Sequence, residues 1–133
     1  QSALKVMVVE DDPISQRVIQ RMLQGVGHQV TLVDRAQKAL DRFGQDIDVI
    51  FMDVSLPGMD GREATRRWRA MEADQEASPM WIIALTAQVT ESQRQQCLDA
   101  GMNDYLYKPV SLERLAAAIG RIGQSEKQIE AAV

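Results

Sequence analysis

Two short, mainly apolar runs in this chain end in carboxylates. Residues 6–9 lead into Glu10 and Asp11, and residues 48–52 lead into Asp53. If the two runs are neighbouring parallel strands, these carboxylates meet at one edge of a sheet. Two carboxylates about 4 Å apart repel by ~4 kcal/mol at an effective dielectric constant of about 20. A divalent cation would offset that repulsion, so we predict a metal-dependent site on an α/β scaffold.

Polar residues also follow two later runs that are predicted as strands. Thr86 follows residues 80–85, and Lys108 follows residues 104–107. In doubly wound sheets, binding sites form beyond the carboxyl ends of the strands. We therefore expect one site to be formed by the side chains just past these strand ends: Glu10, Asp11, Asp53, Thr86 and Lys108.

Apolar runs alternate with amphipathic helical stretches along the whole chain. Strands are predicted at residues 4–9, 28–33, 48–52, 80–85 and 104–107, with a helix after each. This alternation predicts parallel strands joined by right-handed crossovers, with helices on both faces. The fold class is therefore α/β, a (βα)5 doubly wound sheet of five parallel strands, for which we expect the flavodoxin-like strand order 2-1-3-4-5. We expect the domain to occupy residues 4–122, with residues 123–133 as a C-terminal tail or helix extension.

The first and last predicted helices carry apolar stripes. Pro13 suits the first turn of a helix, and apolar residues then recur at a spacing of four: Ile14, Val18 and Met22. Ser111 can cap the last helix, whose predicted stripe is Leu112, Leu115, Ala116 and Ile119. Such spacing is typical of one face of an amphipathic helix.

The overall composition limits the kind of protein. The chain has 133 residues, of which 45% are hydrophobic and 26% are charged, and a formal net charge of −4. This balance is typical of one globular domain, and the acidic charge argues against nucleic-acid binding. No apolar run approaches the ~18 residues of a membrane span, and the single Cys97 favours a reduced, cytoplasmic setting. The composition does not determine the oligomeric state, and it is compatible with a monomer.

Five segments at the predicted strand ends carry a familiar set of motifs, at residues 8–13, 51–53, 56–61, 83–87 and 105–109. Together they resemble the receiver domain of two-component response regulators. Residues 101–106 are most similar to receivers attached to hybrid sensor histidine kinases. The resemblance implies a phosphorelay module that is either a single-domain regulator or part of a hybrid kinase, and we favour the second. Such a part is expected in the cytoplasm even if the parent kinase is anchored in a membrane.

The resemblance implies a phosphoacceptor and a metal site. Asp53 would accept a phosphoryl group from a phosphohistidine on a partner kinase or phosphotransfer domain. Asp11 and Asp53 would bind Mg²⁺ (or Mn²⁺) directly, and Glu10 would act through a water. The backbone carbonyl of Ser55 would complete the protein ligands. Such a receiver is a phosphoacceptor rather than a turnover enzyme, although a hybrid parent would also carry kinase activity.

The same resemblance implies three contacts to the phosphoryl oxygens: Lys108, the Thr86 hydroxyl and the Ala87 backbone N–H. It suggests a cis peptide bond before Pro109 that aims Lys108 inward. It also implies a switch, in which Thr86 moves toward the phosphoryl group and Tyr105 turns into the vacated volume. This would change the face formed by the fourth helix and the fifth strand.

Two further positions are expected to tune the lifetime of the phosphorylated state. Ser55 lies two residues after Asp53, and Gln88 lies two residues after Thr86. The resemblance implies that both side chains affect the attack of water on the phosphoryl group. The sole histidine, His28, opens the second predicted strand, far from the acidic residues, so the phosphodonor must come from another protein or domain.

Three alternatives share the same architecture. A flavodoxin-like cofactor-binding module would need a Ser-, Thr- or Gly-rich phosphate loop after the first strand, and residues 10–13 are instead acidic. An aspartyl phosphohydrolase would usually carry a second acid two residues after its nucleophile, where this chain has Ser55. A receiver-like protein used only for contacts would be expected to lose site residues, and none is missing.

Overall fold

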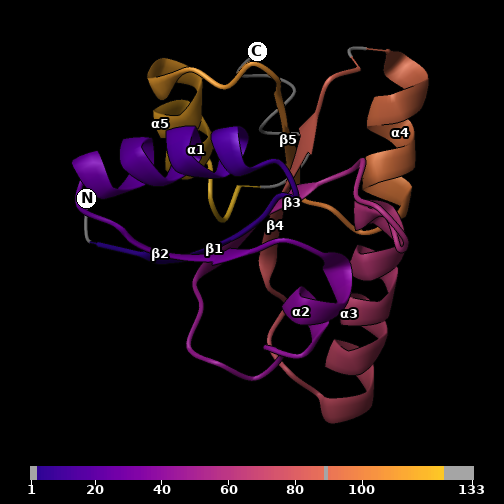
Figure 1. Ribbon diagram of the computed structural model, residues 1–133. Coiled ribbons are helices and arrows are strands. Elements are labelled where there is room, and N and C mark those ends of the chain that lie inside the picture. The colour runs from indigo at the N-terminus through magenta and orange to yellow at the C-terminus, as the bar shows by residue number, and fades with distance from the viewer. Residues whose placement is uncertain (1–2, 89, 125–133) are drawn as a thin grey trace.

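The computed structural model describes residues 3–88 and 90–124, whose helices and strands alternate along the chain (Figure 1). The strands are β1 (Lys5–Val9), β2 (Gln29–Val33), β3 (Val49–Asp53), β4 (Trp81–Thr86) and β5 (Asp104–Tyr107). The helices are α1 (Pro13–Gly25), α2 (Ala36–Leu40), α3 (Gly61–Gln75), α4 (Glu91–Asp99) and α5 (Leu112–Gly120). The predicted tail, from residue 125 onward, lies outside the described residues.

The strands form one parallel sheet in the order β2-β1-β3-β4-β5. Helices α1 and α5 cover one face, and α2, α3 and α4 cover the other (Figure 1). Each face buries its own apolar cluster, which contains Leu23 on the first side and Trp68 on the second. All residues of β3 are buried, as expected for a strand covered on both faces. The predicted (βα)5 doubly wound, flavodoxin-like fold is therefore confirmed.

The strand register brings the candidate site residues to one edge of the sheet. The pairs at the carboxyl ends of the strands are Val9 with Met52, Asp53 with Leu85, and Thr86 with Tyr107. Glu10 and Asp11 therefore leave β1 beside the end of β3. Asp53 and Thr86 are the last residues of their strands, so each strand ends one residue later than predicted, and the sheet fixes their main chains directly.

Side-chain caps fix the starts of four helices. Each capping side chain accepts a hydrogen bond from the backbone N–H three residues later, and the caps are Asp12, Asp60, Thr90 and Ser111. The predicted cap at Ser111 is confirmed. Two of these caps, Asp12 and Asp60, begin α1 and α3, the helices that follow the acidic ends of β1 and β3.

The buried face of α1 differs from the predicted stripe. Ile14 is 73% exposed and Val18 is 42% exposed, whereas Ile19 and Leu23 are buried. The stripe of α1 that packs against the sheet therefore lies one position further along the sequence than predicted. The apolar face of α1 is wider than the part that the core covers. This leaves an apolar strip of α1 on the surface.

The stripe of α5 is confirmed for Leu115 and Ile119 and wrong for two other positions. Leu112 is 47% exposed and Ala116 is exposed, while Ala118 is buried in their place. The buried set has the i, i+3, i+4 spacing of a narrow core-facing stripe. As in α1, the apolar face of the helix is wider than the part of it that contacts the sheet.

His28 lies at the opposite end of the sheet from the acidic residues. Its side chain is buried, and its Nδ1 accepts a hydrogen bond from the Leu4 backbone N–H at 3.0 Å. Its role is thus structural, joining the segments that lead into β1 and β2. The prediction that His28 lies away from the acidic site is confirmed.

Candidate functional site

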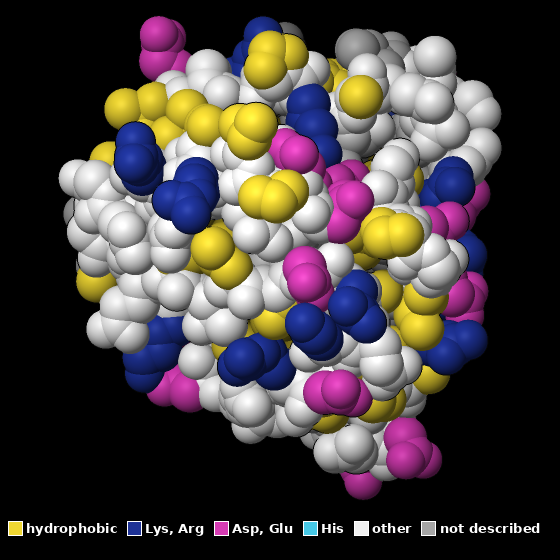
Figure 2. Space-filling model, in the orientation of Figure 1, with side chains coloured by type: hydrophobic (Ala, Val, Ile, Leu, Met, Phe, Trp, Pro, Cys, Tyr) yellow, Lys and Arg dark blue, Asp and Glu magenta, His cyan; other side chains and the backbone are white. Residues whose placement is uncertain are grey.

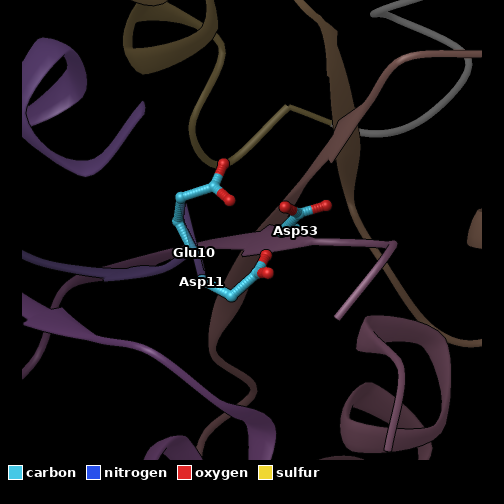
Figure 3. A group of neighbouring side chains, drawn as sticks. All are labelled: Glu10, Asp11 and Asp53. Atoms are coloured by element: carbon cyan, nitrogen blue, oxygen red, sulfur yellow. The ribbon is translucent and has the colours of Figure 1, made fainter. Parts of the chain in front are cut away.

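Three carboxylates meet at the carboxyl edge of the sheet. Glu10 and Asp11 come from the loop after β1, and Asp53 ends β3 (Figure 3). One carboxylate oxygen of each lies within 4.8 Å of those of the other two. Glu10 and Asp53 are buried, at 1% and 3% exposure, and Asp11 is exposed. The predicted acidic cluster is therefore present, with one side open to solvent.

A single ammonium group bridges the two buried carboxylates. Lys108 Nζ lies 2.8 Å from Asp53 Oδ2, to which it donates a hydrogen bond, and 2.7 Å from Glu10 Oε1. The predicted cis peptide bond between Lys108 and Pro109 is confirmed. The backbone N–H of Lys108 also donates to the Thr86 carbonyl at 2.8 Å, which ties the end of β5 to the end of β4.

The backbone after β3 holds the other oxygen of Asp53. The Ser55 N–H donates to Asp53 Oδ1 at 2.9 Å. The Val54 N–H donates to the Leu85 carbonyl at 2.9 Å, which continues the pairing of β3 with β4. Both carboxylate oxygens of Asp53 thus have a donor, so the carboxylate has a defined direction.

Burial and charge oppose each other at this site. Burial is the main cause that raises the pKa of Glu10 above its ordinary value of 4.5, a hydrogen bond to Asp53 adds to it, and Lys108 opposes it. Burial by itself would lower the pKa of Lys108, but Asp53 and Glu10 outweigh it and raise that pKa above 10.5. Lys108 is therefore charged at neutral pH, whereas the buried Glu10 carboxyl group is one whose ionised form a bound cation would stabilise.

The donor set fits a hard divalent cation. All three side chains offer carboxylate oxygens, the ligands that Mg²⁺ prefers, and Mg²⁺ keeps several waters. Two oxygens on opposite sides of one Mg²⁺ lie ~4.2 Å apart, from bond lengths of ~2.1 Å. The observed spacing of up to 4.8 Å is only slightly wider, and the open side at Asp11 leaves room for water. Three carboxylates against one ammonium group also leave negative charge for a cation to neutralise.

The structure brings the β4 residues to the same corner. Thr86 is buried at the end of β4, and its Oγ1 accepts a hydrogen bond from the Gln88 N–H at 3.1 Å. Ala87 and Gln88 are exposed in the following loop. The predicted switch residue, Tyr105, is half-buried on the neighbouring strand β5.

Aromatic and cationic neighbours surround Tyr105. Its ring centre lies 5.4 Å from that of Tyr107 and 6.0 Å from the guanidinium carbon of Arg94, which comes from α4. Arg94 in turn makes an ion pair with Glu91 at 2.6 Å. Tyr105 thus contacts α4, as the predicted switch requires.

Three features of the site were not predicted from sequence. They are the ion pair of Glu10 with Lys108, the Ser55 N–H bond to Asp53, and the contact of Gly61 with the Asp53 main chain. The first two depend on side-chain and peptide directions that a pattern of residue types does not specify. Gly61 follows the capping Asp60, a pattern that by itself indicates only a turn into a helix.

A sequence model of the response regulator receiver domain matches residues 6–120. The chain belongs to this family. It is a receiver domain of two-component phosphorelay signalling, and its acidic cluster fits the magnesium-binding phosphoacceptor site of such a domain.

Relatives of this receiver domain include sensor histidine kinases. The chain is 38% identical over 118 residues to sensor protein GacS of Pseudomonas syringae pv. syringae, covering 88% of the chain and 13% of GacS. It is 36% identical over 114 residues to the histidine-protein kinase BarA of Escherichia coli K12, covering 85% of the chain and 12% of BarA. The resemblance to receivers of hybrid kinases is confirmed, and the chain spans a small part of these proteins.

Solved structures agree with this assignment. The receiver domain of a sensor histidine kinase from Pseudomonas aeruginosa PAO1 is 41% identical, with a TM-score of 0.78 over 90% of this chain and 97% of that one. That structure has a magnesium ion coordinated in its active site cleft. The receiver of a Saccharomyces cerevisiae response regulator, solved with a histidine phosphotransfer protein, is 31% identical with a TM-score of 0.86, covering 91% and 89% of the two chains. Among the described residues of our chain, no helix could cross a membrane.

Proposed function

We propose that Asp53 accepts a phosphoryl group from a phosphohistidine of a partner protein. One carboxylate oxygen of Asp53 forms a bond to phosphorus while the phosphorus–nitrogen bond breaks, and its electron pair returns to the histidine ring. The product is an acyl phosphate on Asp53. The observation that carries the proposal is that the buried Asp53 carboxylate meets two further carboxylates and the Lys108 ammonium at one corner.

The surrounding residues are assigned roles by their place around Asp53. Phosphoryl transfer depends mainly on positioning and charge neutralisation. Lys108 already donates a hydrogen bond to Asp53 Oδ2. It is therefore placed to donate to a phosphoryl oxygen once the phosphoryl group is bound to Asp53. The Thr86 hydroxyl and the Ala87 N–H are proposed as further donors. The Thr86 hydroxyl is at present engaged with the Gln88 backbone, so it must exchange that contact for the phosphoryl group.

We further propose that Asp11 and Asp53 bind Mg²⁺ directly, that Glu10 acts through a water, and that the Ser55 carbonyl completes the protein ligands. When bound, the ion neutralises charge on the transferred group and the attacking carboxylate. Mn²⁺ also prefers carboxylate, carbonyl and water ligands, so it is proposed to substitute. The clustering of the three carboxylate oxygens within 4.8 Å supports this assignment.

An exposed apolar groove beside the site suits the phosphodonor. The groove has a volume of about 150 Å³ and is lined by Ile14, Ser15, Val18, Ile19, Lys108, Pro109 and Val110. Because Lys108 belongs both to this groove and to the phosphoacceptor site, a protein seated there has access to Asp53. Figure 2 shows apolar side chains gathered over the area of α1 and α5, with basic side chains beside them.

We propose that a helical phosphotransfer or kinase domain docks in this groove through apolar side chains. Arg17 and Arg21 are exposed on α1, so a partner with acidic residues around its apolar contact is favoured. The yeast relative was solved with a histidine phosphotransfer protein, which supports the choice of partner class.

The proposal is tested by comparing two phosphodonors. The 133-residue chain is incubated with Mg²⁺ and either acetyl phosphate or a phosphorylated phosphotransfer domain, and intact mass is followed over time. We expect one phosphoryl group per chain from either donor, and loss of both reactions with EDTA. Val18→Asp places a charge in the groove, so it is expected to slow transfer from the protein donor about 10-fold or more and to leave acetyl phosphate unaffected.

Val26→Asp is the matched control, because Val26 is also an exposed valine, at 49%, just after α1 and outside the groove. It is expected to behave as the wild type with both donors. No adduct in the wild type would overturn the proposed function, and release of many phosphates per chain would favour a phosphohydrolase. Equal transfer rates for Val18→Asp and wild type would exclude the groove as the docking site.

We also propose that phosphorylation moves Thr86 and allows Tyr105 to turn inward, which changes the α4–β5 face. The ring of Tyr105 lies under Arg94 of α4, so a turn of this ring must alter that contact. Tyr105→Ala is expected to remove most of the phosphorylation-dependent amide shifts of α4 in nitrogen–proton NMR spectra. Tyr107→Ala is the control and is expected to keep these shifts. Phosphorylation-dependent shifts of α4 that are unchanged in Tyr105→Ala would exclude the coupling.

Two wider assignments complete the proposal. Ser55 and Gln88 are exposed beside Asp53 and Thr86 and are proposed to tune water attack, so unchanged dephosphorylation rates in Ser55→Ala and Gln88→Ala would remove that role. The domain is proposed to serve a hybrid histidine kinase, as the sensor kinases among its relatives suggest, and to lie in the cytoplasm. A full-length gene that encodes no kinase module with this receiver would contradict that assignment.

A further inference from the structure

The first residue of α3, Gly61, lies directly against the main chain of Asp53. A Cβ atom added to Gly61 would lie 2.1 Å from the Asp53 carbonyl oxygen and 2.9 Å from its carbonyl carbon. It would also lie 2.9 Å from Cγ of Met52. These distances are far inside the ~3.5–4.0 Å at which nonbonded atoms attract. Any side chain at this position must therefore displace either the end of β3 or the start of α3.

The need for glycine here is steric rather than conformational. Gly61 does not have the positive φ angle that five other glycines of the described residues have. Its backbone is ordinary for the first turn of a helix, where intrinsic propensity favours alanine over glycine. Gly120, in α5, shows the contrast, because a Cβ added there meets nothing within 4 Å. The close contact with Asp53 is thus the feature that distinguishes Gly61.

The first turn of α3 is tied to the strand at this same point. The Gly61 N–H donates to the Val54 carbonyl at 3.0 Å, and the Thr65 hydroxyl donates to the Gly61 carbonyl at 2.8 Å. The Asp60 side chain caps the helix by accepting from the Glu63 N–H at 2.9 Å. The last two bonds order the first turn of α3, and the first joins it to the residue that follows β3, so the helix start cannot move away from Asp53 without losing the Gly61–Val54 bond.

The far end of α3 is anchored as well. The Arg69 guanidinium donates to the Gly101 carbonyl and to Asn103 Oδ1, each at 2.8 Å. The buried Glu72 pairs with Arg69 at 2.9 Å and accepts from the Met80 N–H at 2.6 Å. A retreat of the whole helix would break this second network. The main chain of Asp53 is therefore set by contact with a helix that is fixed at both ends.

We propose that Gly61 is a positioning residue for phosphoryl transfer. Because Gly61 has no side chain, α3 can pack directly against the Asp53 main chain. This contact fixes the direction in which the Asp53 side chain points from the end of β3. The bonds of that carboxylate to Ser55 N–H and to Lys108 depend on this direction. The inference rests on the proposed role of Asp53 and adds a residue that touches neither metal nor phosphoryl group.

The test compares Gly61→Ala with Gly120→Ala, the same chemical change in two helices. Nitrogen–proton spectra of the metal-free chain are expected to show a moved Ser55 amide resonance in Gly61→Ala only. In Mg²⁺ titrations by calorimetry, the Kd of Gly61→Ala is expected to rise about 10-fold or more, the size typical when support of a metal ligand is lost. At saturating Mg²⁺, phosphorylation by acetyl phosphate is expected to slow about 100-fold, as for a reacting group misplaced by about 1 Å.

A purely structural role would lower only the thermal unfolding temperature. A Gly61→Ala chain that melts earlier but keeps the wild-type Ser55 resonance, Mg²⁺ affinity and phosphorylation rate would overturn the inference. Absence of Mg²⁺ binding and of an adduct in the wild type would instead contradict the proposed function, and the metal-free spectra would still test the contact.

A second variant keeps the inference testable if Gly61→Ala does not fold. Thr65→Val removes the hydroxyl that holds the Gly61 carbonyl and adds no bulk. It is expected to move the Ser55 resonance in the same direction by a smaller amount and to weaken Mg²⁺ binding a few-fold, a smaller effect than the ~10-fold typical of a lost outer-shell partner. A Thr65→Val chain with the wild-type Ser55 resonance and Mg²⁺ affinity would overturn the inference.

Discussion

Replacing Asp53 with asparagine is expected to abolish formation of the phosphoryl adduct. An amide oxygen is a much poorer nucleophile than a carboxylate oxygen, and the amide also brings no negative charge to the metal site. Asparagine keeps an oxygen that can accept from the Ser55 N–H, which donates to Asp53 at 2.9 Å. The fold is therefore expected to survive, and intact mass after incubation with Mg²⁺ and acetyl phosphate measures the loss.

Asp12→Asn is the matched control for this prediction. Asp12 belongs to the same acidic loop but caps α1, accepting from the Ser15 N–H at 2.8 Å, and is not one of the clustered carboxylates. Asparagine is as good a helix cap as aspartate, so this variant is expected to be phosphorylated like the wild type. An adduct that persists in Asp53→Asn would show that the acceptor lies elsewhere, and an adduct that vanishes equally in Asp12→Asn would show that the loss is not specific to Asp53.

The fold was predictable because each strand and helix carried its own local signal. Strict alternation of apolar runs and helical stretches leaves few topologies, and right-handed crossovers reduce them further. The helix faces were less predictable. Ile14 and Val18 have the spacing of a buried stripe, yet the sheet packs against Ile19 and Leu23. Spacing identifies an apolar face, but which part of a wide face meets the sheet depends on how the helix packs.

The composition of the site was predictable from strand ends, whereas its contacts were not. Glu10, Asp11, Asp53 and Lys108 meet as the parallel topology requires. The sequence did not indicate that Lys108 spans both buried carboxylates, since this depends on the path of the backbone after β5. Nor did it indicate that Gly61 touches Asp53, because a glycine after a helix cap has the same pattern whether or not a neighbour lies against it.

Lys108→Ala is expected to change metal binding and phosphoryl transfer in opposite directions. Lys108 is paired with both Glu10 and Asp53, at 2.7 and 2.8 Å. In Lys108→Ala no ammonium group offsets the repulsion between these two carboxylates, so binding of Mg²⁺ relieves more of that repulsion. The affinity for Mg²⁺ is therefore expected to rise about 10-fold, which is ~1.4 kcal/mol. Phosphorylation at saturating Mg²⁺ is expected to slow about 100-fold, because the developing charge loses a preorganised donor.

The opposite signs separate an electrostatic role of Lys108 from a supporting one. If Lys108 only kept the Glu10 and Asp53 carboxylates in position, its removal would weaken Mg²⁺ binding and also slow phosphorylation. Lys38→Ala is the control for loss of a positive charge, because Lys38 pairs with Asp34 at 2.9 Å on the half-exposed surface of α2. It is expected to leave both quantities unchanged. Calorimetric titration and intact-mass kinetics on the same preparations decide between the two roles, and a Lys108→Ala chain with weaker Mg²⁺ binding would contradict the electrostatic one.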